Sequence, residues 1–171
     1  MPVTTRLPNN ATQNLQDHWS QIRGWYKGAY KANSHVTMGT IDSEGRANLT
    51  PIGSLILRSD MNGFYFDIFA SQLSKNLDAN PEITIQFVNS GKLFWLRSLI
   101  SGKFATPPAV RLFGTAGPRR EATEREVARF EKRIGALRML KGYSLLWKNL
   151  KYVRNIDFHG FQAVNLGKMT R

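Results

Sequence analysis

The feature that most constrains the fold is an alternation of side chains in two segments. Ile83, Ile85 and Phe87 alternate with Thr84, Gln86 and Val88, and Val110, Leu112 and Ala116 alternate with Arg111, Phe113 and Thr115. Successive side chains of a strand point to opposite faces of a sheet, so this two-residue period is typical of strands with one buried face. The pair Asn62-Gly63 is in addition a strong signal for a tight hairpin turn. Together these patterns predict an antiparallel sheet whose strands are joined by short turns.

Further strands are predicted on both sides of these segments. Residues 153–158 and 161–166 predict a final strand or a pair of strands, whereas residues 93–105 favour neither helix nor strand. Three early segments are rich in apolar and β-branched residues and are separated by the turns Asp42–Gly45 and Asn62-Gly63, so we expect them to form a meander. These segments are His35–Ile41, Asn48–Leu57 and Phe64–Ile68.

Helices are predicted in three places. Leu15, Trp19, Ile22 and Tyr26 recur at helical spacing, which predicts an N-terminal helix over about residues 12–27. A short helix begins at Ser71, whose side chain suits a helix N-cap, and ends before Asn80-Pro81. The sequence Thr123–Glu126 fits a capping box, and the apolar residues that follow at helical spacing predict a helix over about 121–139. Those apolar residues are Val127, Phe130, Ile134 and Leu137.

The chain therefore favours a mainly β fold with about six or seven strands and two or three peripheral helices. Strands dominate and the turns are short, which is typical of a Greek-key or split β-barrel. A length of 171 residues suits one domain, and no repeat or low-complexity linker interrupts it. We expect residues 1–171 to form a single domain with the N-terminal helix at its start and the 121–139 helix as an insertion.

Composition limits the classes of function. The chain has no cysteine, which excludes disulfides, thiolate metal sites and cysteine nucleophiles. No apolar run approaches the roughly 20 residues that span a bilayer, and no secretory signal is recognised, so we expect a cytoplasmic protein. The formal charge is +12, with eleven Lys or Arg and four Glu between residues 119 and 154. Such a field attracts anions, which include phosphorylated cofactors, nucleic acid and acidic lipid.

The sharpest local candidate for a binding site is the start of the second helix, Ser71–Leu77. Free N–H groups and the helix dipole make a helix start suitable for an anion. The hydroxyl groups of Ser71 and Ser74 and the charge of Lys75 would strengthen such a site, and a phosphate would fit it. The alternative is an ordinary helix cap with solvated neighbours.

Other candidate residues carry weaker signals. Arg111 stands in an otherwise apolar strand segment, where it either faces solvent or reaches an anion or a partner chain. Asp67 follows a strand beside the helix start and suits a turn or capping acid better than a general base. The histidines His18, His35 and His159 have no metal-ligand spacing, so we expect no zinc site.

Six short segments match, in order and spacing, the pattern of one protein family. The chain resembles the pyridoxamine 5′-phosphate oxidase-like family of FMN-binding split barrels over roughly residues 33–167. The six segments are Thr40-Ile41-Asp42-Ser43-Glu44-Gly45-Arg46, Thr50-Pro51-Ile52-Gly53, Gly63-Phe64-Tyr65-Phe66, Ser71 with Leu77-Asp78-Ala79-Asn80-Pro81, Arg111-Leu112-Phe113-Gly114-Thr115-Ala116, and Val153-Arg154-Asn155-Ile156-Asp157-Phe158.

The resemblance implies a homodimer that holds FMN in a cleft between its subunits, with the phosphate near Ser71. The segment from Phe94 to Ile100 is rich in large apolar residues, and we expect part of it to lie in or near the dimer interface. The residues expected around the cofactor are taken from the matching positions and from the helix-start argument. They are Thr50, Pro51, Ile52, Gly53, Ser54, Phe66, Asp67, Ser71, Gln72, Ser74, Lys75, Arg111 and His159.

The chain departs from the family pattern at several of these positions. Where the family commonly has serine, arginine and lysine, this sequence has Ser71-Gln72-Leu73, and Lys75 is the nearest cation. His159 stands where the oxidase proper has a tryptophan, and the oxidase's arginine and histidine signature after it is replaced by Val164-Asn165-Leu166-Gly167. We therefore do not expect pyridoxamine 5′-phosphate to be the substrate.

Three functions remain open at this stage. The first is an FMN-dependent oxidoreductase with an unknown substrate, in which the flavin supplies the hydride chemistry. The second is a protein of the same fold that binds a flavin or a haem without turnover. The third, for which we see less support, is a basic module that binds nucleic acid, with the aromatic residues among the basic ones between Lys141 and Tyr152 stacking on bases.

Overall fold

The computed structural model describes residues 14–68, 71–135, 142 and 149–170, and its central feature is one antiparallel sheet. The strands are β1 (Val36–Ile41), β2 (Ala47–Ile52), β3 (Ile56–Leu57), β4 (Asn62–Phe66), β5 (Glu82–Val88), β6 (Ala109–Ala116), β7 (Arg120–Glu121) and β8 (Tyr152–Ala163). The helices are α1 (Leu15–Asn33), α2 (Ser71–Ala79), α3 (Lys92–Ser101), α4 (Glu124–Ile134) and the short 3₁₀-helix η2 (Gly167–Thr170).

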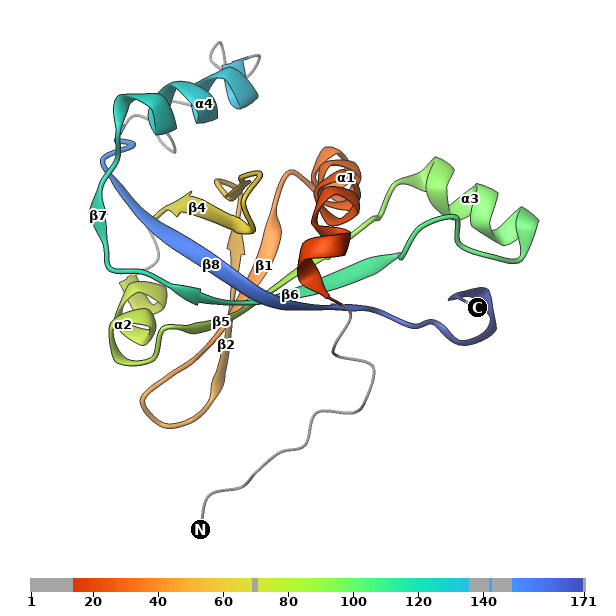
Figure 1. Cartoon of the computed structure of the whole chain (residues 1–171), viewed down its shortest axis with the longest axis horizontal. Coiled ribbons are helices and arrows are strands. Elements are labelled where there is room, and N and C mark those ends of the chain that lie inside the picture. The colour runs from red at the N-terminus through yellow and green to blue at the C-terminus, as the bar shows by residue number, and fades with distance from the viewer. Residues whose placement is uncertain (1–13, 69–70, 136–141, 143–148, 171) are drawn as a thin grey trace.

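The sheet has the strand order β2-β1-β5-β6-β8-β4-β3, with β7 paired to β8, and it curls into a half-barrel (Figure 1). In β5 the buried side chains are Ile83, Ile85 and Phe87, and they alternate with exposed or half-buried ones. The predicted antiparallel, strand-dominated fold is therefore confirmed. We call the face that carries Thr84, Gln86 and their neighbours in register the outer face of the sheet.

The predicted meander is wrong, because the single strand expected over Asn48–Leu57 is broken. β2 pairs with β1 and β3 pairs with β4, and these two hairpins lie at opposite ends of the strand order. The break lies at Gly53–Leu55, where α1 satisfies backbone groups that a ladder would otherwise use. Tyr30 donates its hydroxyl hydrogen bond to the Gly53 carbonyl (2.8 Å), and Tyr26 donates to the Leu55 carbonyl (2.5 Å).

The N-terminal helix α1 extends beyond the predicted end at residue 27. It begins after Asn14, whose side chain accepts a hydrogen bond from the Gln16 N–H, and it ends at Ser34, which is left-handed with φ 62°. The apolar face of α1 enters the main core and packs against inward-facing side chains of the sheet. The buried residues of this face are Leu15, Trp19, Ile22, Tyr26 and Ala29.

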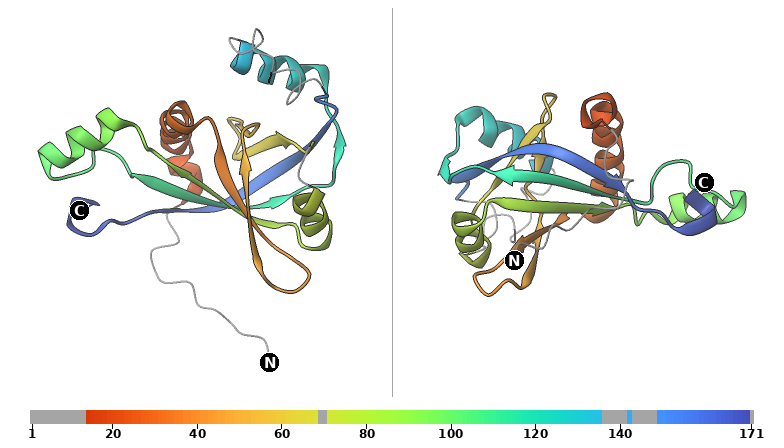
Figure 2. Two further views of the ribbon diagram at one scale, coloured as in Figure 1. Left: turned by 180° about the vertical axis from the view of Figure 1, so that it is seen from behind. Right: turned by 60° about the horizontal axis from the view of Figure 1, so that its bottom comes forward.

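Two further elements were not resolved by the sequence patterns. The ambiguous segment 93–105 contains α3, which ends at Gly102 with φ 66° and extends away from the sheet together with the C-terminal segment (Figures 1 and 2). The final segments form one strand, β8, which ends at Ala163 rather than at Leu166. A register shift against Phe113 and Gly114 leaves His159 as the extra residue of a β-bulge in β8.

The predicted insertion helix is present as α4, and its capping box between Thr123 and Glu126 is confirmed. Leu137 lies outside the described residues. α4 packs on a second hydrophobic cluster, separate from the main core, between itself and the strands β3, β4 and β8. This cluster consists of Ile56, Phe64, Phe66, Phe130, Ile134 and Val153.

Candidate functional site

The structure gathers most of the candidate residues around one corner, where β4 ends and α2 begins. Ser54 follows β2 and lies against the end of β4, where its hydroxyl accepts a hydrogen bond from the Phe66 N–H (3.0 Å). Within α2, the Asn76 side chain donates to the hydroxyl of Thr40 on β1 (3.0 Å). These contacts join segments that are far apart in the sequence: α2 lies against β1, and the residues after β2 lie against the end of β4.

Beneath this corner lies a buried ionic network centred on Arg154 of β8, whose side chain is 2% exposed. Its Nε donates to the Asp67 carboxylate (2.8 Å), and its Nη2 donates to the Ser74 hydroxyl (2.9 Å) and the Asp78 carboxylate (2.7 Å). Ser74 in turn donates to Asp67 (2.8 Å). Asp67 and Ser74, both predicted near the cofactor, therefore fix α2 against β8.

The exposed part of the corner consists of Ser71, Gln72 and Lys75. The first turn of α2 contains no acidic residue, so its positive end is not neutralised within the helix. Lys75 forms no ion pair with any carboxylate among the described residues, and Gln72 donates to Asn76 (2.8 Å). Leu73 is buried in the main core at the position where the family commonly has a lysine.

The other predicted residues of the corner differ in their access to solvent. On the edge strand β2, Pro51 is exposed and Thr50 is half-buried. Gly53 is half-buried and offers its carbonyl to Tyr30. The side chains of the remaining three are buried, so only their backbone groups can reach a ligand. These three are Ile52, Ser54 and Phe66.

Arg111 and His159 lie on the outer face of the sheet. Arg111 donates to the side-chain carbonyls of Gln86 (3.2 Å) and Gln162 (3.1 Å), which flank it on β5 and β8. His159 is exposed at the bulge of β8, with its Nε2 3.4 Å from the Glu82 carboxylate. The structure thus places Arg111 between two neutral amides rather than at the start of α2.

Sequence reasoning missed Arg119, a cation that the structure places at this corner. Its guanidinium lies 4.0 Å from the ring centroid of Tyr152 and donates to the Asp67 backbone carbonyl (3.3 Å). Its Nε lies 3.7 Å from the Asp67 carboxylate, and the side chain is 44% exposed, so part of the guanidinium remains accessible to an anion. The sequence signal available for Arg154 is an arginine inside an apolar strand segment, the same signal that singles out Arg111.

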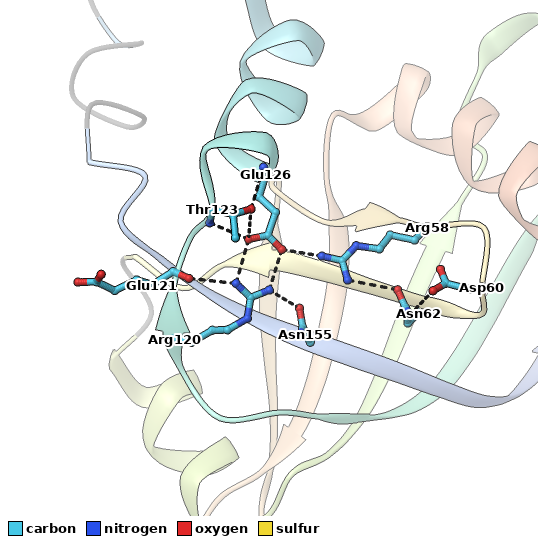
Figure 3. Close-up of polar contacts among 8 residues, drawn as sticks. All are labelled: Arg58, Asp60, Asn62, Arg120, Glu121, Thr123, Glu126 and Asn155. Carbon is cyan, nitrogen blue, oxygen red and sulfur yellow. Dashed lines mark hydrogen bonds and ion pairs between the residues drawn. The ribbon is translucent and has the colours of Figure 1, made fainter.

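A second ionic cluster, also missed, surrounds Glu126 on α4 (Figure 3). Arg120 donates to both carboxylate oxygens (2.7 and 2.9 Å), and Arg58 donates to Oε1 (2.5 Å). The Thr123 N–H donates to the same carboxylate (2.9 Å) as part of the capping box. The hydrogen bond from Arg120 lowers the pKa of Glu126 to about 2, so this carboxylate stays charged at neutral pH.

Tyr65 is the one described residue with a buried side-chain polar atom that has no hydrogen-bond partner. Burial, reinforced by the nearby charge of Asp67, raises the pKa of Tyr65 far above its usual value of 10.0, so the hydroxyl stays neutral. Among the described residues, no group of three His, Asp or Glu side chains is placed to hold a metal ion. No described helix has the length and apolar character needed to cross a bilayer.

Comparisons with known proteins agree with this geometry. The family model described as pyridoxamine 5′-phosphate oxidase matches residues 20–157. No curated protein sequence matches the chain.

Several solved structures share the fold at low sequence identity. An FMN-binding protein from Syntrophomonas wolfei subsp. wolfei has a TM-score of 0.57 at 14% identity, with 89% of this chain and 95% of that chain covered. HutZ, the heme storage protein from Vibrio cholerae, has a TM-score of 0.54 at 16% identity, with 82% and 92% covered. HupZ from Group A Streptococcus has a TM-score of 0.52 at 20% identity, with 83% and 98% covered.

These likenesses confirm the split-barrel fold that the sequence segments implied. The family model covers most of the chain, from within α1 to within β8, and includes the whole of the corner around α2. The chain therefore belongs to the pyridoxamine 5′-phosphate oxidase family.

Proposed function

We propose that this protein binds FMN as a homodimer and serves as a flavin-dependent oxidoreductase. The observation that carries the proposal is the exposed start of α2, where Ser71, Gln72 and Lys75 offer hydroxyl, amide and ammonium donors. Membership of the family and the fold shared with an FMN-binding protein support the choice of ligand. The departures from the family pattern argue against pyridoxamine 5′-phosphate as the substrate.

The phosphate would be held by the start of α2. Lys75 contributes a full charge without a competing carboxylate among the described residues, and the helix dipole adds to it. Arg119 supplies a second accessible cation beside Asp67 and takes the part first assigned to Arg111. The isoalloxazine ring would lie along Thr50–Ser54, where the edge strand β2 leaves its outward side chains uncovered.

A second subunit would complete the cleft. On α3, Leu96, Leu99 and Ile100 are exposed, and Leu49 on β2 is 71% exposed. Large exposed apolar side chains such as those on α3 mark an interaction surface. We assign these apolar side chains to the dimer interface, and light scattering that gave a monomer mass at micromolar concentration would contradict it.

FMN would supply the hydride chemistry, while the protein supplies the phosphate anchor and the slot for the ring. A second candidate function is haem binding without turnover, because the chain shares its fold with a heme storage protein. The absorbance spectrum of the purified protein separates the two, since flavin and haem absorb at different wavelengths. Oxidation of a reduced nicotinamide by the FMN-loaded protein would then separate an enzyme from a flavin carrier.

FMN fluorescence quenching tests the anchor directly. We expect Lys75→Ala to weaken FMN binding roughly 10- to 100-fold, because a charge-assisted contact contributes on the order of 1.5–3 kcal/mol. Ser71→Ala should weaken it by a smaller factor. Lys132→Ala, which removes an exposed lysine from α4, serves as the control and should bind FMN as the native chain does.

Two results would count against the proposal. If both corner variants bind FMN as tightly as the native protein, the phosphate lies elsewhere. If the folded native protein binds no FMN at all, the flavin function itself is wrong and the haem titration becomes the deciding measurement.

A further inference from the structure

A hollow lies between α1, β3 and α4, away from the corner at α2. It has a volume of about 520 Å³, within the range of about 300–1,000 Å³ that is usual for small-molecule sites. α1 contributes Arg23, Lys27 and Lys31 to its lining, and α4 contributes Arg129 and Arg133. We call this feature the α1–α4 groove.

The charges of the groove are not compensated by the protein. No Asp or Glu belongs to its lining, and all twelve acidic residues of the chain lie in the described ranges. None of the five cations forms an ion pair with any of these described carboxylates. Arg58, Arg120 and Arg154, in contrast, each pair with a carboxylate. The sequence adds no acidic residue between positions 132 and 156.

The spacing of these cations makes the absence of partners costly. Arg23, Lys27 and Lys31 follow one another at four-residue intervals on α1, and Arg129 and Arg133 do so on α4. Like charges four residues apart destabilise a helix, each pair by a few tenths of a kcal/mol. Both helices direct such a row of like charges to the same hollow. An anionic ligand that offsets this repulsion explains the arrangement better than solvation of the side chains alone.

Arg133 is held in place as a member of a built site. Its guanidinium donates to the Leu55 carbonyl and to the Tyr26 hydroxyl (2.6 Å) and lies 3.4 Å from the ring centroid of Tyr30. All of these partners are neutral. Burial raises the pKa of Tyr26 to about 12, so its hydroxyl does not become a phenolate counter-ion at neutral pH. Arg133 is thus positioned without being neutralised.

The floor of the groove suits the rest of an organic ligand. Ile56 and Leu57 of β3 line it together with the tyrosine side chains. A phosphate ion alone would leave this apolar surface uncovered, whereas a nucleic acid strand would need a basic track that continues beyond one hollow. A compact ligand with several negative charges and an apolar part would match both the cations of α1 and α4 and the apolar floor.

We propose that the α1–α4 groove binds a nucleoside di- or triphosphate, with the phosphates between the cations of α1 and α4 and the nucleoside over Ile56 and Leu57. This site is distinct from the FMN anchor and needs no contribution from Ser71 or Lys75. The protein would accordingly bind two phosphorylated ligands independently.

Calorimetric titration of the full chain with ATP, and separately with inorganic pyrophosphate, tests the site. The test variant is Lys27→Gln/Arg129→Gln, because both side chains are exposed and form no hydrogen bond or ion pair with another described residue. The control is Arg125→Gln/Lys132→Gln, which removes the same charge from exposed positions of α4 outside the groove. FMN titration of each variant is the second readout.

We expect ATP to bind the native protein, the groove variant to bind it at least tenfold more weakly, and the control to stay within twofold of native. Pyrophosphate should bind the native protein more weakly than ATP, and FMN should bind the groove variant as it binds the native protein. No ATP binding by the native protein, or equal weakening in both double variants, would overturn the proposal. So would loss of FMN affinity in the groove variant, or binding of single-stranded RNA without binding of ATP.

Discussion

Neutralising Glu126 should destabilise the protein more than any other single charge change on α4. Glu126→Gln keeps the shape of the side chain and removes the charge that Arg58 and Arg120 share (Figure 3). The side chain of Glu126 is only 7% exposed, so solvent screens these contacts weakly. The variant leaves two arginines without a carboxylate partner and weakens the capping box of α4.

The magnitude follows from the pKa of Glu126, which falls from an ordinary value of 4.5 to about 2 on folding. At about 1.4 kcal/mol per pKa unit, the charged form contributes about 3 kcal/mol to the free energy of unfolding. Because the folded-state pKa is the lower one, this contribution is complete above about pH 5 and disappears as the pH falls toward 2. At pH 3 roughly half of it, or less, should remain.

Urea unfolding of the native and variant proteins at equal protein concentration measures this contribution. At pH 7 we expect Glu126→Gln to lose about 2–3 kcal/mol, and the difference from native to shrink when both are measured at pH 3. Glu121→Gln is the matched control, since Glu121 is 75% exposed and lies 3.8 Å from Lys151. An exposed pair of this kind contributes about 0–1 kcal/mol. Equal losses for both variants at pH 7, or a difference for Glu126→Gln that does not change with pH, would refute the reasoning.

Two further substitutions test packing. Tyr65→Phe should leave the free energy of unfolding unchanged or raise it by up to about 1 kcal/mol, because the hydroxyl that it removes is buried without a described partner. A loss of more than 1 kcal/mol in urea unfolding would show that this hydroxyl is satisfied. Gly114→Ala should lower the melting temperature and cost about 1–3 kcal/mol, because a Cβ there would lie 2.7 Å from the Asp157 carbonyl oxygen. Native-like melting of this variant would mean that β6 and β8 separate easily.

Local patterns in the sequence were enough to predict elements that depend on neighbours along the chain. The alternation in Ile83–Val88 predicted β5, and the capping box at Thr123 predicted the start of α4. The break at Gly53–Leu55 could not be predicted in this way. It depends on Tyr26 and Tyr30, which belong to a different element and reach those carbonyls only after α1 has packed.

The same limit applies to the candidate site. Hydroxyls and a lysine at the start of α2 are visible in the sequence, and the structure indeed leaves Ser71 and Lys75 exposed. The pairing of Asp67 with Arg154 joins residues 87 positions apart, and a charged residue in an apolar strand does not indicate which partner it meets. Arg111 and Arg154 carried the same signal, yet one lies between amides and the other is fully buried.

Ionic contacts to the sheet set the orientation of α2 and α4, the two helices that carry most of the proposed anion-binding groups, and for the buried Arg154 this orientation matters more than a net gain in stability. Taking charges out of water costs several kcal/mol per ion, and a paired buried charge often only balances that cost. A hydrophobic residue at position 154 would pack β8 equally well but would release Ser74 and Asp78, and with them the orientation of α2. Glu126 has the corresponding role for α4, since its arginine partners come from the ends of neighbouring strands. Each exposed set of donors is therefore carried by a helix whose position is set by directional contacts to the sheet, and an anion bound there meets groups that are already in place.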